Sequence, residues 1–280
     1  MQDSKGLQYW VAHLSRSDLP VLKQTARDLA ALRTDENRLT VLAVAGVIAR
    51  DPMMTVKLLR YLQQHKHKAQ TTEVIQIEQA LLMLGIEPFF NHIAPEPIVE
   101  EVLQAHVTAL APVLRVVHRS HRASQYAMDW AVRLRDLHYE EVRIAALLHD
   151  IAEILMWCFA PDAMLEIRAI QQQDKSLRSH HVQQQVFGFG LIELQKELAL
   201  HWGLPKLLLN LMHDASMHQQ RERNVALAIN LARHSANGWD DAALPDDYKD
   251  IGELLHISAQ EAMVMVGAEA GVVCDLAKPH

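Results

Sequence analysis

The sequence predicts an all-α fold built from many short helices. Half of the 280 residues are apolar but only 5% are aromatic, and leucine and alanine are abundant, which favours helices over sheets. Signals that start and stop helices recur along the chain. No segment alternates apolar and polar residues long enough to predict a strand.

Two early segments place a carboxylate just before a proline, a pattern typical of a helix start. These are Asp18-Leu19-Pro20 and Asp51-Pro52. After the second, apolar residues recur at helical spacing, which predicts a helix from Pro52 onward. These apolar residues are Met53, Val56, Leu59 and Leu62.

A further helix is predicted from residue 77, where apolar residues again recur at helical spacing. Gly85 follows and can end that helix in a left-handed conformation. In HWGLPKLLL, residues 201–209, Gly203 predicts the end of one helix and Pro205 the start of the next.

Two changes in composition suggest three consecutive segments. HIAPEPIVEE, residues 92–101, holds two prolines that disfavour helix, and SANGWDDAALPDDYKD, residues 235–250, is rich in turn-forming residues. We therefore expect an N-terminal helical subdomain over 1–94, a helical core over 95–235 and a helical extension over 236–280.

Charge and apolar content limit the partners. The net charge of −7 argues against general binding to nucleic acid, which needs a basic surface. No apolar run approaches the roughly 20 residues that span a membrane, and no secretory signal is seen. The two cysteines are far apart and are read as free thiols. The sequence thus predicts a cytoplasmic protein without a membrane partner.

The stretch AALLHDIAEIL, residues 145–155, carries His149 and Asp150 inside an apolar helical run. His121 lies 28 residues earlier, far enough for one helix, a turn near 136–139 and a return. Antiparallel helices would then bring the three side chains together. Imidazole and carboxylate suit divalent ions such as Fe, Mn or Zn, and such an ion could activate water for attack on phosphate.

The order of His followed by His-Asp resembles the HD phosphohydrolase superfamily, and more of the chain resembles its HDOD branch. Five segments carry this resemblance, over residues 15–215: LPVLKQTARDLAAL, ARDPMMTVKLLRYL, IQIEQALLMLGIEPFFN, AALLHDIAEI and LHWGLPKLLLNLMHD. The resemblance implies an HD-domain-like helical bundle with an N-terminal helical subdomain. It implies a role in bacterial signalling, often without catalysis.

The sequence departs from the metal-binding pattern of these relatives. The related HD-GYP branch has Gly-Lys after its His-Asp pair, whereas this chain has Ala152-Glu153, and a glutamate repels substrate phosphate. Relatives often carry Asp-His where this chain has Gly190-Leu191. The closing aspartate would fall near Arg233, a fixed cation.

The resemblance leaves a reduced set of candidate ligands, and three interpretations stay open. The residues could form a hydrogen-bonded cluster, hold one ion without catalysis, or serve a working phosphohydrolase. The expected cofactor is accordingly none or one divalent metal (Fe, Mn, Zn or Mg). The candidate metal ligands are His121, His149, Asp150, His213 and Asp214.

Several arginines and a histidine make the helix around His121 basic, so Arg119 and Arg122 are candidates for binding an anion, although a solvated helix face is the simpler interpretation. The favoured function is a non-catalytic signalling module that binds a protein partner or a nucleotide. The alternative is a metal-dependent phosphohydrolase acting on a phosphate ester or cyclic dinucleotide. The sequence is also compatible with a homo-oligomer.

Overall fold

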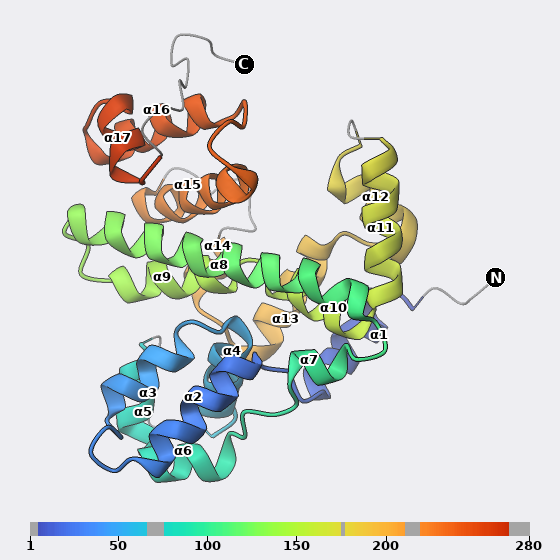
Figure 1. Cartoon of the computed structure of the whole chain (residues 1–280), viewed down its shortest axis with the longest axis vertical. Helices are drawn as coiled ribbons and strands as arrows, with labels where there is room; N and C mark the ends of the chain where they lie inside the picture. The colour runs from blue at the N-terminus through green and yellow to red at the C-terminus, as the bar shows by residue number, and fades with distance from the viewer. Residues whose placement is uncertain (1–4, 66–75, 175–176, 211–218, 269–280) are drawn as a thin grey trace. The chain divides into compact units, whose positions relative to one another are not determined.

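A computed structural model describes residues 5–65, 76–174, 177–210 and 219–268 of the chain (Figure 1). The described residues form helices and turns, which confirms the all-α prediction. Their one β-type contact is a single parallel bridge between Val21 and Ile98. No single described helix is both long enough and apolar enough to cross a membrane.

By contacts, the chain forms two compact units, each assembled from two stretches. Unit 1 comprises 1–117 and 150–205, and unit 2 comprises 118–149 and 206–280. The three consecutive segments expected at 1–94, 95–235 and 236–280 were a division by composition, and they stay a prediction.

Unit 1 holds most of the helices. Those that lie wholly within it are α1 (Leu7–Arg16), α2 (Lys23–Thr34), α3 (Val41–Ile48), α4 (Pro52–Gln64), α5 (Ile77–Leu84), α6 (Ile86–His92), α7 (Val99–Val102), α10 (Ile151–Phe159), α11 (Pro161–Gln173), α12 (Ser179–Phe187) and α13 (Leu191–Trp202). Helix α3 packs on α2 and α5, while α13 contacts α1, α4 and α10. Helix α13 therefore connects the N-terminal helices to the later ones inside this unit.

Unit 2 is built around α15. Its elements are α9 (Tyr139–Leu148), α14 (Lys206–Asn210), α15 (Gln220–His234), the 3-10 turn η2 (Ser235–Asn237), α16 (Leu244–Leu255) and α17 (Ala259–Met265). The long helix α8 (Val107–Arg133) contributes its second half. Helix α15 packs against α9 and α16, and α16 packs against α17. The fold of this unit is thus a small helical cluster.

The predicted start of α4 is confirmed. Asp51 is the N-cap residue, and its carboxylate Oδ1 accepts hydrogen bonds from the backbone N–H groups of Met53 and Met54 at 2.9 and 3.1 Å. Pro52 is the first helical residue. Both methionines are fully buried, so this pair belongs to the core.

The predicted helix start at Asp18-Leu19-Pro20 is wrong. Helix α2 begins only at Lys23, and its N-cap residue is Leu22, whose side chain cannot cap it. The chain is extended before it because Val21 pairs with the segment around Ile98. The Val21 N–H donates to the Pro97 carbonyl at 2.8 Å, and the Val21 carbonyl accepts from Val99 N–H at 2.9 Å. These long-range bonds outweigh the local signal.

Both predicted helix ends at glycine are confirmed. Gly203 ends α13 in the left-handed conformation with φ +61° and ψ +41°. Gly85 ends α5 with a positive φ of +86°, but its ψ of +149° lies outside the expected left-handed conformation. Helix α14 begins at Lys206, directly after Pro205. At Gly203 an added Cβ would also meet the Gln63 side chain at 3.0 Å, so both space and conformation require glycine there.

Candidate functional site

The His-Asp pair lies at the junction of two helices. Helix α9 ends at Leu148, His149 is its C-cap residue, and Asp150 is the N-cap residue of α10. The neighbours Leu148 and Ile151 are fully buried, whereas His149 and Asp150 are half-buried. His149 belongs to unit 2 and Asp150 to unit 1, so the pair marks a point where the chain passes between the units.

His121 lies on α8, and its side chain is half-buried. The turn expected near 136–139 is found, because α8 ends at Arg133 and α9 begins at Tyr139. Whether the three side chains form one hydrogen-bonded cluster stays a prediction. His213 and Asp214, the other two candidate ligands, lie outside the described residues.

Whether a metal ion is bound at the His-Asp junction stays a prediction. Within the described ranges, no group of three or more His, Cys, Asp or Glu side chains is placed to share an ion. Gly190 is the N-cap residue of α13, and a Cβ there would lie 2.8 Å from Cδ2 of His180. A carboxylate at position 190 would therefore require His180 to move. Leu191 beside it is buried and offers no ligand atom.

Ala152, the second residue after the His-Asp pair, lies in a contact between helices. Ala152 is buried, and its backbone N–H donates to Oε1 of Gln195 at 2.8 Å. Gln195, on α13, is also buried. This bond satisfies an N–H in the first turn of α10, which otherwise has no partner within the helix. The backbone of Ala152 thus takes part in a contact between α10 and α13.

The anion candidates on α8 are partly engaged within unit 2. Arg122 donates to the Tyr126 hydroxyl at 2.6 Å, and its guanidinium lies 5.6 Å from the ring centroids of both Tyr126 and Trp239. This cation–π contact attaches the Trp239 loop to α8. Arg119 is half-buried on the same helix. Anion binding at either arginine stays a prediction.

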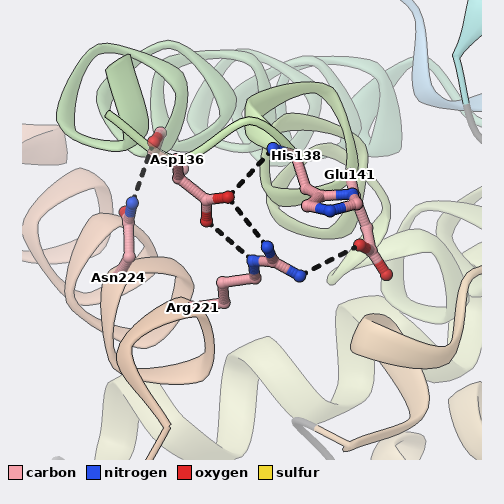
Figure 2. A network of polar contacts seen from close by, with 6 residues as sticks. Asp136, His138, Glu141, Arg221 and Asn224 are labelled. Atoms are coloured by element: carbon pink, nitrogen blue, oxygen red, sulfur yellow. Dashed lines mark hydrogen bonds and ion pairs between the residues drawn. The ribbon is translucent and has the colours of Figure 1, made fainter. Parts of the chain in front are cut away.

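A polar network in unit 2 joins the α8–α9 turn to the first turn of α15. Figure 2 shows the Arg221 guanidinium between Asp136 and Glu141. Arg221 makes two hydrogen bonds to Asp136, at 2.7 and 2.9 Å, and lies 3.8 Å from a Glu141 oxygen. Asp136 also accepts from the His138 N–H at 2.9 Å. This bidentate pairing fixes the position and the orientation of the Arg221 guanidinium relative to the Asp136 carboxylate.

The charges of this network lower the pKa of Asp136. Burial raises the pKa of this carboxyl, but the hydrogen bonds from Arg221 and His138 and the Arg221 charge outweigh burial. The same pair raises the pKa of Arg221, chiefly through the hydrogen bond to Asp136. Nearby, Nδ2 of Asn224 on α15 donates to the Ala127 carbonyl of α8 at 3.0 Å. These bonds fasten α15 to α8.

A second ion pair in unit 2 links α15 to α16. Nδ1 of His234 lies 2.6 Å from Oδ2 of Asp247, whose side chain is 8% exposed. The hydrogen bond to Asp247 raises the pKa of His234, and burial opposes it only in part. The charged imidazole therefore stabilises the folded unit below the ordinary pKa of 6.5, and this contribution is lost as the pH rises through the higher folded pKa.

We expect the pKa of His234, measured from its Cε1 proton by NMR titration, to lie above 6.5. Replacing Asp247 with asparagine should bring it down, because the charge that holds the proton is removed. His256, the C-cap residue of α16, serves as the control histidine. An unchanged His234 titration in the variant would contradict this pairing.

A polar pocket of about 730 Å³ lies in unit 1, and sequence reasoning missed it. Four residues of α4 line it at positions i, i+3, i+4 and i+7, which places them on one face of the helix. Loop residues before α2 and around Pro97 complete it. The lining residues include Asp18, Lys57, Arg60, Tyr61, Gln64, His92, Glu96 and Glu101.

The cations of this pocket are held by backbone carbonyls. Lys57 is 7% exposed, and its ammonium donates to the carbonyls of Leu19 and Glu96. Arg60 donates to the Ser17 carbonyl at 3.1 Å. Burial lowers the pKa of both groups, with the Asp18 charge opposing. The helical spacing of polar residues along α4 was the sequence signal that could have revealed the pocket.

Comparison with known proteins identifies the fold and a family. The sequence profile of the HDOD domain matches residues 19–218. No curated protein matches the chain. The MmoQ response regulator of Methylococcus capsulatus has a similar structure, with a TM-score of 0.68 and 16% identity over 91% of this chain and 100% of that one. A virulence factor of Campylobacter jejuni has a TM-score of 0.65 and 18% identity over 99% and 95% of the two chains.

Proposed function

Because this chain belongs to the HDOD domain family, we propose that it is a non-catalytic regulatory module, which acts by binding a signalling protein or a nucleotide rather than by hydrolysis. The observation that carries the proposal is the loss of donors around the His-Asp junction. Positions where metal-binding relatives place ligands hold Gly190 and Leu191 here, and His180 closes the space beside Gly190.

The charge after the pair supports the same proposal. Glu153 is half-buried in the first turn of α10, three residues beyond Asp150. A carboxylate there opposes the approach of a phosphate ester, since two negative charges a few ångström apart repel strongly outside bulk water. The HD-GYP pattern has a lysine at this position, where this chain has Glu153. The module would instead bind its partner through the surfaces of its helices.

We further propose a cytoplasmic location. Cys158 is buried in α10, and burial, with a smaller effect of the Asp51 charge, raises the pKa of its thiol to about 12. This thiol stays protonated and unreactive at neutral pH, as suits a structural cysteine in a reducing compartment. The net charge of −7 supports partners other than nucleic acid or anionic membrane.

The test is a hydrolysis assay on the full chain loaded with Mn²⁺ or Fe²⁺. We expect no cleavage of bis(p-nitrophenyl) phosphate above background, and equal residual rates for the wild type and for His149→Ala. Elemental analysis of protein purified without added metal or chelator should find less than one transition metal per chain.

Stability provides the complementary measurement. We expect Asp150→Ala to lower the melting temperature by a few degrees, as loss of a half-buried hydrogen-bonded cluster would. The exposed His118→Ala on α8 is the control and should leave it unchanged. A metal-dependent rate that disappears in His149→Ala, with stability intact, would establish the phosphohydrolase instead.

A further inference from the structure

The pocket of unit 1 brings a polar face of α4 into a concave site. Polar faces of helices usually point to open water, whereas this one lines a pocket of about 730 Å³. That volume falls within the range of small-molecule sites. The opposite wall is formed by the end of α6, by the loop through Pro97 and by Glu101 of α7. The volume and the concave shape therefore suit a small-molecule ligand.

The two cations of this pocket, Lys57 and Arg60, keep hydrogen-bond donors that a ligand can use. Buried charges are normally paired with an opposite charge. Neither Lys57 nor Arg60 has a carboxylate within 4 Å among the described residues, and both contact only neutral carbonyls. Among the described residues, Arg60 makes one hydrogen bond, to Ser17, which leaves most of its five N–H donors for a ligand.

The carboxylates of the pocket come from other elements. Asp18 precedes α2, Glu96 lies in the loop before α7, and Glu101 belongs to α7 itself. All three are exposed at the rim, and in the described part of the chain none forms an ion pair. Three carboxylates against two cations repel a polyanion such as a nucleoside triphosphate.

We propose that this pocket binds a small zwitterion of the α-amino acid class. The carboxylate of the ligand pairs with Arg60, whose planar fork matches it, and with the Lys57 ammonium. The ammonium of the ligand faces the carboxylate of Glu101 on α7. The ligand side chain lies along the wall formed by Tyr61 and His92, whose rings are stacked with centroids 5.8 Å apart.

The structural role of Lys57 does not account for the whole site. Its bonds to Leu19 and Glu96 join the two loops that the Val21–Ile98 bridge also connects. That role requires neither the Arg60 donors nor a concave surface with charges of both signs. The inference goes beyond the proposed function, because it uses none of the residues at the His-Asp junction and can fail independently.

The experiment titrates the full chain, labelled with ¹⁵N, with the twenty proteinogenic L-amino acids and follows the amide resonances of α4. At least one amino acid should shift them in a saturable way. Its N-acetyl derivative lacks the ammonium, and its amide lacks the carboxylate. Each derivative should bind at least tenfold more weakly than the parent amino acid, because one charge pair is lost.

Variants then assign each charge to its partner. Arg60→Gln should weaken the amino acid at least tenfold but leave the affinity for its amide unchanged, and Glu101→Gln should weaken the amino acid but leave the N-acetyl derivative unchanged. Arg50→Gln and Glu87→Gln change exposed charges elsewhere in unit 1 and should have no effect. Arg60→Lys keeps the positive charge but loses the bidentate guanidinium. This variant tests the site if Arg60→Gln fails to fold.

Two results would overturn the proposal. If no amino acid shifts the α4 resonances at 10 mM, a concentration about tenfold above the Kd of a weak, millimolar metabolite site, the pocket has no such ligand. If the N-acetyl derivative, acetate or inorganic phosphate binds as tightly as the amino acid, the site recognises a simple anion.

Discussion

Replacing Asp51 with alanine is expected to lower the free energy of unfolding of unit 1 by about 4 kcal/mol, because one buried carboxylate satisfies three backbone donors. Oδ1 caps α4 through Met53 and Met54, and Oδ2 accepts from the Leu22 N–H at 2.8 Å. The residue is fully buried, so water cannot replace these bonds. Loss of a helix cap alone costs about 1 kcal/mol.

Asparagine at position 51 separates the two roles of this side chain. Its carbonyl oxygen can still cap α4, but its amide would face the Leu22 N–H, donor against donor. We therefore expect Asp51→Asn to cost about half as much as alanine. Urea denaturation followed by circular dichroism measures both. Asp162→Ala, at a carboxylate that is 83% exposed in the same unit, is the control.

An equal loss for the Asp51→Asn and Asp51→Ala variants would show that the bond to Leu22 carries the whole effect. A loss below 1 kcal/mol for alanine would contradict the role assigned to Asp51. The pKa of this carboxyl is raised by burial, against the four hydrogen bonds that favour its charged form. Its contribution is thus mainly one of satisfied hydrogen bonds rather than of charge.

Local signals predicted the parts of the fold that local chemistry decides. The cap at Asp51, the helix end at Gly203 and the turn after α8 each depend on a few adjacent residues, and each is confirmed. Asp18-Leu19-Pro20 has the same local pattern as Asp51-Pro52 but does not start a helix. The difference comes from Pro97 and Val99, about 80 residues away, which bind Val21.

The sites were less predictable, because they depend on residues that are distant in sequence. The pocket of unit 1 combines residues near positions 18, 60 and 96. Only the spacing of Lys57, Arg60, Tyr61 and Gln64 along α4 was visible beforehand, and it reads equally well as a solvated face. The His-Asp pair was easy to recognise in the sequence. Whether it can hold a metal ion depends on ligand side chains from other helices, which the pair itself does not predict.

The Arg221–Asp136 pair joins residues that are 85 positions apart, and no sequence pattern predicts it. Replacing Arg221 with alanine is expected to lower the free energy of unfolding of unit 2 by about 2 kcal/mol at pH 7. Two charge-assisted bonds to a carboxylate that is 12% exposed are lost, while the 38% exposure of Arg221 moderates the effect. Arg223→Ala, whose Glu253 partner is 68% exposed, should cost less than about 0.5 kcal/mol.

The pH dependence distinguishes the ion pair from simple packing. The pKa of Asp136 lies below its ordinary value of 3.8 in the folded chain, so its contribution is complete well above that value and is lost as the pH falls through the lower folded pKa. The difference in stability between the wild type and Arg221→Ala should therefore shrink between pH 5 and pH 2, as measured by urea denaturation. A difference that stays constant over this range would indicate that Arg221 acts through its aliphatic stem, since packing against neighbours does not titrate.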